Sequence, residues 1–512
     1  MSIWVILIIY LAVMIGIGVY CKKKTSNVSD FVLGGRSLGP WFTAFAYGTS
    51  YFSAVVFIGY AGQFGWAYGI SATWIGIGNA LIGSLLAWLV LGKRTRIMTK
   101  HLEATTMPEF FERRFGCKKL KIVSALIVFI FLIPYTASVY NGLSRLFSMA
   151  FGFDYAYCII AMAVITAVYV ILGGYMATAI NDFVQGIIML GGIVAVIYFA
   201  LAEKGGLFTA MKSLAEVSDA GVPQGSLGSL FGPDPINLLG VVILTSLGTW
   251  GLPQMVQKFY AIKDNASIKR GTVISTLFAV VVSGGSYFLG SFGRIFVDNL
   301  EVGSNGKPVY DSIIPTLLDS ALPDILIGIV VVLVLSASMS TLSSLVLTSS
   351  ATLTIDLIKP LRSNMGEKHM VRIMRIFIAC FLVISVVIAL NPNAYITTLM
   401  SISWGALAGA FLAPFLYGLF SKKITRAAVW ASFISGVGIT VVHMVLFSLG
   451  WFPGLVEAVQ GLGWKLNILS PINAGAFAML FGLVLVPVVS AFTKKPEQEI
   501  IDHAFAGYQS EI

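Results

Sequence analysis

Charge is scarce in this chain of 512 residues. Asp, Glu, Lys and Arg together make up 11% of it, whereas a soluble domain carries about a quarter. Cysteine is also scarce, and Cys21, Cys117, Cys158 and Cys380 show no spacing typical of disulfides or metal sites. Hydrophobic residues make up 57%, and the mean hydropathy is +0.89. We therefore expect an all-α integral membrane protein with no soluble domain attached.

Histidine is too sparse for a metal or nucleophilic centre, and no nucleophile–base pair stands out. We predict that the protein is not an enzyme. Thirteen apolar stretches are long enough to cross a bilayer, which takes about 20 residues each. They lie near residues 3–20, 41–62, 69–91, 122–147, 155–173, 180–201, 237–257, 272–296, 324–350, 373–391, 395–419, 427–449 and 471–491.

The net charge of +10 can be explained by an excess of Lys and Arg in loops on one side of the membrane. With the N-terminus outside and the C-terminus in the cytoplasm, 27 of the 33 Lys and Arg residues fall on the inner side. Cytoplasmic loops are enriched in these residues. We therefore predict a multi-pass protein of the cell (cytoplasmic) membrane that contacts lipid, and the basic balance gives no support to a nucleic-acid partner.

Two of the apolar stretches are interrupted. Small and hydroxyl residues break the 41–62 stretch at 48–53, and the 237–257 stretch is broken at 245–246 and again at 251–254. Paired interruptions in two halves of a membrane protein indicate a midplane binding site in a secondary transporter. An unwound helix frees backbone carbonyls, which lipid does not tolerate unless they line a site.

The positions of the interruptions predict an inverted repeat. A first five-helix group covers about 41–201 and a second about 237–419, and each begins with an interrupted helix. Because five is odd, the second group enters the membrane from the opposite side. The segments 1–21 and 427–491 are expected to be peripheral. The whole chain, 1–512, is then one transporter domain.

The 324–350 stretch carries hydroxyls on one helical face, with Ala337, Ser340, Thr341, Ser344 and Thr348 at helical spacing. Such a stripe also suits close helix packing or bonding to its own backbone. Two of these hydroxyls, the Ala337 carbonyl and two carbonyls freed in the 41–62 stretch would give five neutral oxygens. That set suits a monovalent cation such as Na⁺.

Asp182 lies near one end of the 180–201 stretch. It would either cap that helix, or face the bundle interior as an ion or proton site. Asp264 and Asp356, at the edges of loops, are expected to be solvated. We expect no Lys or Arg at the cavity beside the interrupted helices.

Three motifs resemble those of the sodium/solute symporter family, which includes bacterial proline, pantothenate, sialic acid and sugar transporters. They are 34–40 (GGRSLGP), 173–175 with 181–185 (GGY and NDFVQ), and 339–343 (MSTLS). The resemblance covers nearly the whole chain. It implies thirteen spans on an inverted five-helix-repeat core, and alternating access driven by Na⁺.

Carried over to this sequence, the family's Na⁺ site falls on the carbonyls of Thr49, Phe52 and Ala337 and the hydroxyls of Ser340 and Thr341. Some relatives resemble a two-ion design, which would place a second Na⁺ or a proton relay at Asp182, Ser343 and Ser344. Our candidates for the solute cavity are Ser53, Ala54, Tyr135, Trp250 and Gln254.

The resemblance leaves the solute open. Proline transporters carry Asp where this chain has Tyr51, and pantothenate transporters resemble it there and across 251–264. Sugar transporters carry polar residues at the positions of Tyr51 and Val56. We predict a Na⁺-coupled symporter that imports a small organic solute, either an amino acid such as proline or a carboxylate such as pantothenate. The alternatives are a proton-coupled carrier that uses Asp182, and a sodium/sugar or sialic acid symporter.

Overall fold

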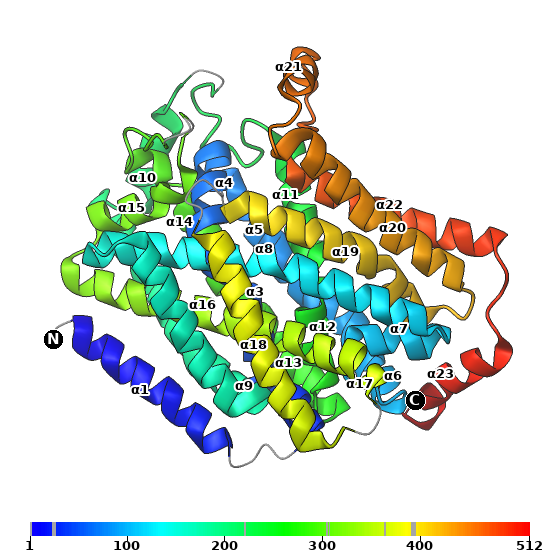
Figure 1. The fold of residues 1–512 in the computed structure, drawn as a ribbon. Helices are drawn as coiled ribbons and strands as arrows, with labels where there is room; N and C mark the ends of the chain where they lie inside the picture. Colours follow the sequence, from blue (N-terminus) through cyan, green and yellow to red (C-terminus); the bar gives the residue numbers. More distant parts are fainter. Residues whose placement is uncertain are drawn as a thin grey trace.

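The computed structural model describes residues 3–22, 27–219, 222–303, 306, 308–362, 365–390 and 396–511. Within these ranges the regular structure is helical, and pairing between extended segments is limited to isolated bridges (Figure 1). This confirms the predicted all-α class. By length and hydropathy, nine of the described helices could span a membrane, and one bent pair adds a tenth.

Each predicted span falls on helix, apart from short turns and residues 391–395, which lie outside the described residues. The corresponding helices are α1 (Ile3–Lys22), α3 (Pro40–Tyr51) with the π-helical turn η2 (Val55–Tyr60) and α4 (Ala61–Tyr68), α5 (Thr73–Gly78) leading through π-helical turns to α6 (Lys93–His101), α8 (Lys118–Phe151), α9 (Tyr155–Glu203), α11 (Pro235–Leu247) with α12 (Pro253–Tyr260), α13 (Asn265–Ala279) with α14 (Gly285–Gly290), α16 (Asp324–Thr352), α18 (Glu367–Ala389), α19 (Ile396–Phe420), α20 (Arg426–His443) and α22 (Pro471–Phe492).

The number of apolar helices among the described residues is smaller than thirteen partly because some neighbouring spans form one continuous helical segment that turns sharply at a glycine. Gly174 has φ 57° and ψ −153° in the middle of α9, which holds two predicted spans. Gly69, between α4 and α5, has φ 58° and ψ −139°. A side chain is strongly disfavoured at such angles, so glycine is what lets the chain turn there without a long loop.

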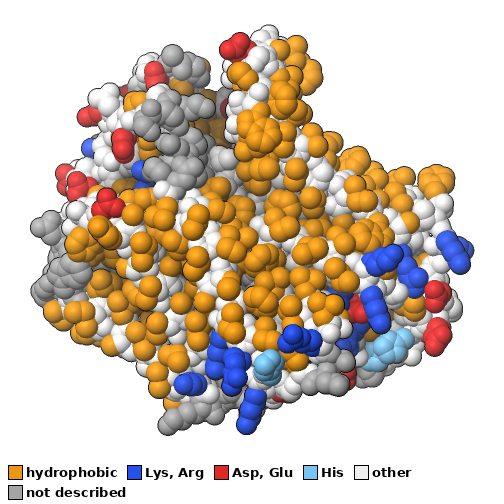
Figure 2. Space-filling view, in the orientation of Figure 1, with side chains coloured by type: hydrophobic (Ala, Val, Ile, Leu, Met, Phe, Trp, Pro, Cys, Tyr) orange, Lys and Arg blue, Asp and Glu red, His pale blue; other side chains and the backbone are white. Residues whose placement is uncertain are grey.

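Short helices fill the connections between the spans. They are α2 (Val28–Leu33), α7 (Met107–Phe115), α10 (Leu207–Glu216), α15 (Ile313–Ala321), α17 (Lys359–Leu361) and α21 (Pro453–Gly461). One more helix, α23 (Gln498–Glu511), follows the last span. Figure 2 shows a broad hydrophobic belt, with Lys and Arg gathered along the lower rim, where Figure 1 places α6, α7, α17 and α23. This is the charge distribution expected of a protein that crosses a bilayer.

The centre of the bundle is formed by α16 and α19. In each of them, 89% of the most apolar 18-residue stretch is buried inside the protein, whereas the share is 33% in α18, α20 and α22. A helix that is apolar on all sides and buried must pack against others on every side. The hydroxyl residues of α16 therefore face neighbouring helices, among them α3 and α9.

Candidate ion and solute site

The first helix break lies where the sequence predicted it. Helix α3 ends at Tyr51, Phe52 is extended (φ −99°, ψ 123°), and helical structure resumes with the π-helical turn from Val55. The Ser53 hydroxyl accepts the Val55 N–H at 3.2 Å and so caps the second half. An extended residue interrupts the i to i−4 bonding, which leaves carbonyls of the last turn of α3 free to face other groups.

The freed carbonyls face Thr341 on α16. Its hydroxyl oxygen lies 3.4 Å from the Phe52 and Ser50 carbonyl oxygens and 3.5 Å from that of Thr49. It also lies 3.2 Å from the Ala337 carbonyl oxygen, one turn back on its own helix. A hydroxyl has one proton and cannot satisfy four carbonyls. Acceptors are therefore in surplus at this point.

Ser340 completes the group. Its hydroxyl donates to the Thr49 hydroxyl at 2.8 Å, and Thr49 donates in turn to the Phe45 carbonyl at 2.7 Å. The structure thus brings together all five positions expected for Na⁺, and adds the Ser50 carbonyl, which sequence reasoning missed. We call this group the oxygen cage: Thr49, Ser50, Phe52, Ala337, Ser340 and Thr341.

Asp182 is fully buried inside α9, beyond the kink at Gly174. It does not cap a helix, so that alternative is wrong. Its carboxylate oxygen Oδ2 lies 3.8 Å from the Lys258 Nζ atom. Ser343, expected beside it, donates its hydroxyl to the Ser340 carbonyl at 2.8 Å.

Lys258 overturns the expectation that no basic residue lies at the site. It is 1% exposed, and its ammonium donates to the Ser344 hydroxyl at 2.8 Å. Ser344 also contacts the Ser50 hydroxyl at 2.8 Å, so Lys258 adjoins the oxygen cage. The sequence places Lys258 next to a cytoplasmic basic run. The structure turns it inward because α12 is bent by 40° from α11.

The second helix break lies between those two helices. After α11 come the 3₁₀ turn Gly248–Trp250 and an extended Leu252 (φ −81°, ψ 122°), and Pro253 begins α12. The Tyr51 hydroxyl donates to the Thr245 carbonyl at 2.6 Å. One hydrogen bond therefore joins the residue that ends α3 to the helix that precedes the second break.

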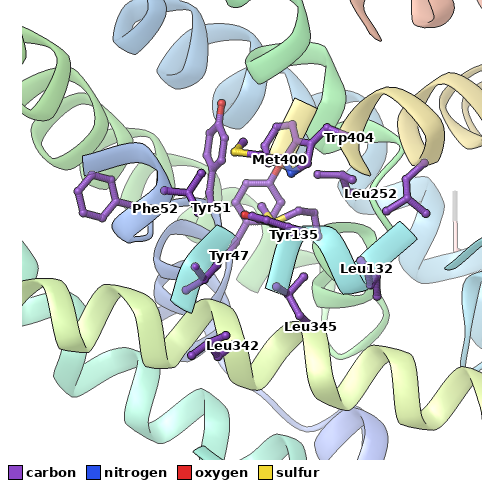
Figure 3. Packing of buried hydrophobic residues seen from close by; sticks show 14 of the residues in the cluster. Tyr47, Tyr51, Phe52, Leu132, Tyr135, Leu252, Leu342, Leu345, Met400 and Trp404 are labelled. Atoms are coloured by element: carbon purple, nitrogen blue, oxygen red, sulfur yellow. The ribbon is translucent and has the colours of Figure 1, made fainter. Parts of the chain in front are cut away.

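An aromatic cluster, Tyr51, Tyr135 and Trp404, lies between the two breaks (Figure 3). The Tyr51 ring stacks on Trp404 at 6.2 Å, and Tyr135 of α8 meets Trp404 edge-on at 5.9 Å. Gly248 of the second break lies against the same indole: a Cβ there would be 2.7 Å from the ring. Trp404 was missed by sequence reasoning, because a single tryptophan in an apolar span usually signals packing.

The expected cavity residues are only partly together. Ser53 and Ala54 lie in the first break, and Tyr135 belongs to the aromatic cluster. Trp250 instead donates its indole N–H to the Ile82 carbonyl at 3.0 Å. Gln254 is buried on α12, and its Oε1 has no hydrogen-bond partner among the described residues.

The site is closed in this conformation. The cavity at the first break has a volume of about 10 Å³, room for about one water. It is lined by Gly48, Tyr51, Phe52, Val56, Phe278, Ala279 and Ser283. Admitting an organic solute therefore requires helices around the break to move apart.

Two buried carboxylates lie farther from the cage. Asp356, expected to be solvated, is fully buried; it accepts the Thr106 hydroxyl at 2.9 Å and lies 3.7 Å from the Lys121 Nζ atom. The reason is that its turn packs against α8. Asp311, in the connection before α15, accepts the Ile396 N–H at 3.4 Å, with the Arg145 Nε atom 4.0 Å away. Burial raises the pKa of Asp311 to about 6, and Arg145 opposes the rise.

The chain is similar over nearly its whole length to known transporters. The chain is 32% identical over 492 residues to an osmoregulated proline transporter of Bacillus subtilis (strain 168), covering 95% of this chain and 94% of that one. It is 30% identical over 507 residues to a sodium/proline symporter of Staphylococcus aureus (strain JH9), covering 96% and 93%.

Among solved structures, the fold is similar to a substrate-bound, outward-open Na⁺-coupled sialic acid symporter. The TM-score is 0.71 at 16% identity, over 97% of this chain and 99% of that one. The family model described as the sodium:solute symporter family matches residues 31–436. The protein is thus a membrane transporter and not an enzyme, and it belongs to the sodium:solute symporter family.

Proposed function

We propose that this protein imports a small organic solute together with Na⁺, and that the oxygen cage holds the ion. The observation that carries the proposal is the Thr341 hydroxyl, which lies within 3.5 Å of four carbonyl oxygens, three of them at the helix break. A hard cation needs several oxygen ligands, and neutral ones suffice for a monovalent ion. In this site Na⁺ would satisfy acceptors that one proton cannot.

Proline is the first solute to test. The relatives named above are proline transporters, and the aromatic cluster offers apolar ring faces beside the cage. Trp404 and Tyr135 would pack against the solute's ring, and its carboxylate would face a half-helix N-terminus or the ion. Pantothenate and other small carboxylates come next. Sugars and sialic acid need more polar partners than these rings supply.

Coupling follows from the helix breaks. Na⁺ in the cage would hold α3 against α16. Because the Tyr51 hydroxyl donates to the Thr245 carbonyl, a shift of α3 would also move the helix before the second break. An ion drives the change only if the two conformations differ in their affinity for it. Each inward charge adds about 2.3 kcal/mol per 100 mV of membrane potential.

For the topology, we propose an N-terminus outside the cell and a C-terminus in the cytoplasm, in the cytoplasmic membrane. The core would be an inverted repeat, about 41–201 and 237–419. The rim of Lys and Arg in Figure 2 supports this orientation, because it would then face the cytoplasm.

Uptake into proteoliposomes tests the proposal. An inward Na⁺ gradient should drive accumulation of radiolabelled proline, and unlabelled pantothenate, other amino acids, monocarboxylates and sugars would be screened as competitors. A second arm imposes a pH gradient in Na⁺-free buffer. Uptake driven by the pH gradient alone would contradict Na⁺ coupling and favour a proton-coupled carrier that uses Asp182.

A further inference from the structure

A tethered cation lies where a second Na⁺ would be expected. The residues that would hold such an ion are Asp182, Ser343 and Ser344, and the ammonium of Lys258 contacts two of them. It lies 3.8 Å from the Asp182 carboxylate and donates to the Ser344 hydroxyl at 2.8 Å. We propose that Lys258 takes the place of the second ion, so that this transporter binds one Na⁺ per cycle. The inference rests on the proposed Na⁺ coupling.

The geometry of the Lys258 ammonium resembles ion coordination. Besides the carboxylate and the hydroxyl, the third group around it is the ring of Tyr175, whose centroid is 5.1 Å from Nζ. An aromatic face attracts a cation. A carboxylate, a hydroxyl and a ring thus surround one positive charge, and the three come from two helices, α9 and α16.

Burial makes the two cations mutually exclusive. The side chains of Asp182 and Lys258 are 0% and 2% exposed, and together they carry no net charge. With Na⁺ in the oxygen cage, a second Na⁺ beside this pair would add a further positive charge with no counter-charge inside the membrane, which is strongly unfavourable. Without Lys258, the carboxylate would lack a counter-charge, and Na⁺ would be the ion available to supply it.

The contact also lies close enough to the oxygen cage to affect it. Ser344 links the Lys258 ammonium to the Ser50 hydroxyl, and the Ser50 carbonyl faces Thr341. Lys258 comes from the second half of one broken helix, and Ser50 from the first half of the other. The contacts of Lys258 therefore depend on how the two broken helices lie relative to each other.

Equilibrium binding of ²²Na⁺ to the purified full-length protein, counted per chain, tests the inference. The native protein should bind one ion. Lys258→Gln should bind two, and adding Asp182→Asn to that variant should return the count to one. Lys258→Arg keeps the charge and should remain at one, as should Lys121→Gln, which removes a buried lysine elsewhere. Thr341→Ala should raise the Kd of the single Na⁺ more than tenfold above that of the native protein.

Two ions on the native protein, or one on a folded Lys258→Gln variant, would overturn the inference and leave Na⁺ coupling intact. No binding to the native protein would overturn Na⁺ coupling and this inference with it. If Lys258→Gln does not fold, the native count still tests the inference, because two ions on the native protein would overturn it.

Discussion

The two helix breaks are similar in backbone and opposite in chemistry. At the first break, Phe52 is extended, and carbonyls of the last turn of α3 and of Phe52 itself face the Thr341 hydroxyl of α16. At the second, Leu252 is extended, but the nearby side chains bond to the 69–91 span: Thr249 donates to the Gly83 carbonyl and Trp250 to that of Ile82. The first break thus places several oxygen acceptors together, whereas the helix after the second break carries a buried cation of its own, Lys258. An unwound helix is thus not by itself an ion site; the side chains that face it decide.

The largest expected effect comes from the oxygen cage. Thr341→Ala or Ser340→Ala removes one neutral oxygen from the ion, and a bond to a charged group contributes about 1.5–3 kcal/mol. The Na⁺ concentration for half-maximal proline uptake should therefore rise roughly 10- to 100-fold. Ser338→Ala is the matched control, because Ser338 lies on the same helix and donates to its own backbone at Val334. An unchanged Na⁺ dependence of uptake in both variants would contradict the proposal that the oxygen cage binds Na⁺.

A substitution in the aromatic cluster should weaken binding of the solute and leave binding of Na⁺ unchanged. Trp404→Leu removes the indole that both Tyr51 and Tyr135 contact, and an aromatic pair contributes about 0.5–1.5 kcal/mol beyond burial. We expect the KM for proline to rise about tenfold, with the Na⁺ dependence little changed. Trp430→Leu, outside the cluster, serves as the control. A variant that loses Na⁺ affinity and keeps its proline KM would contradict the assignment of this cluster to the solute.

The link between the breaks should have a smaller effect. Tyr51→Phe deletes the hydrogen bond to the Thr245 carbonyl, worth about 1 kcal/mol, and keeps the ring on Trp404. The dependence of proline affinity on Na⁺ should weaken about fivefold. Tyr47→Phe removes a comparable bond, to the Gly83 carbonyl, without touching α11. If both variants weaken coupling equally, the Tyr51 bond has no special role between the breaks.

The smallest expected effect lies away from both breaks, at Asp311. Its pKa is about 6 in the folded protein, above its ordinary value of 3.8, so the folded protein binds the proton more tightly than the unfolded chain does. The stabilisation is complete below pH 3.8 and is lost as the pH rises through 6. Relative to Asp311→Asn, the native melting temperature should therefore fall by a few degrees between pH 5 and 7.5. A constant difference across that range would contradict the prediction.

Both breaks and the hydroxyl face of α16 could be predicted from sequence, because small residues in an apolar run and helical spacing are local signals. Ser340 and Thr341 lie on that face, whereas Thr49 and the exact set of expected ligands followed from the family resemblance. The burial of Lys258 could not be predicted, since it depends on the bend between α11 and α12. Asp356 was misplaced for a similar reason: its neighbours in sequence suggest a loop edge, whereas the turn that carries it packs against α8. Trp404 and the Ser50 carbonyl depend on contacts between distant helices.

A cryo-electron microscopy map of the protein in NaCl, compared with one in choline chloride, tests the oxygen cage most directly. We predict a density peak between the Thr341 hydroxyl and the carbonyls of Thr49, Phe52 and Ala337 that is present in NaCl and absent in choline chloride. Identical maps at that point, with Thr341 bonded only to protein in both salts, would contradict the account.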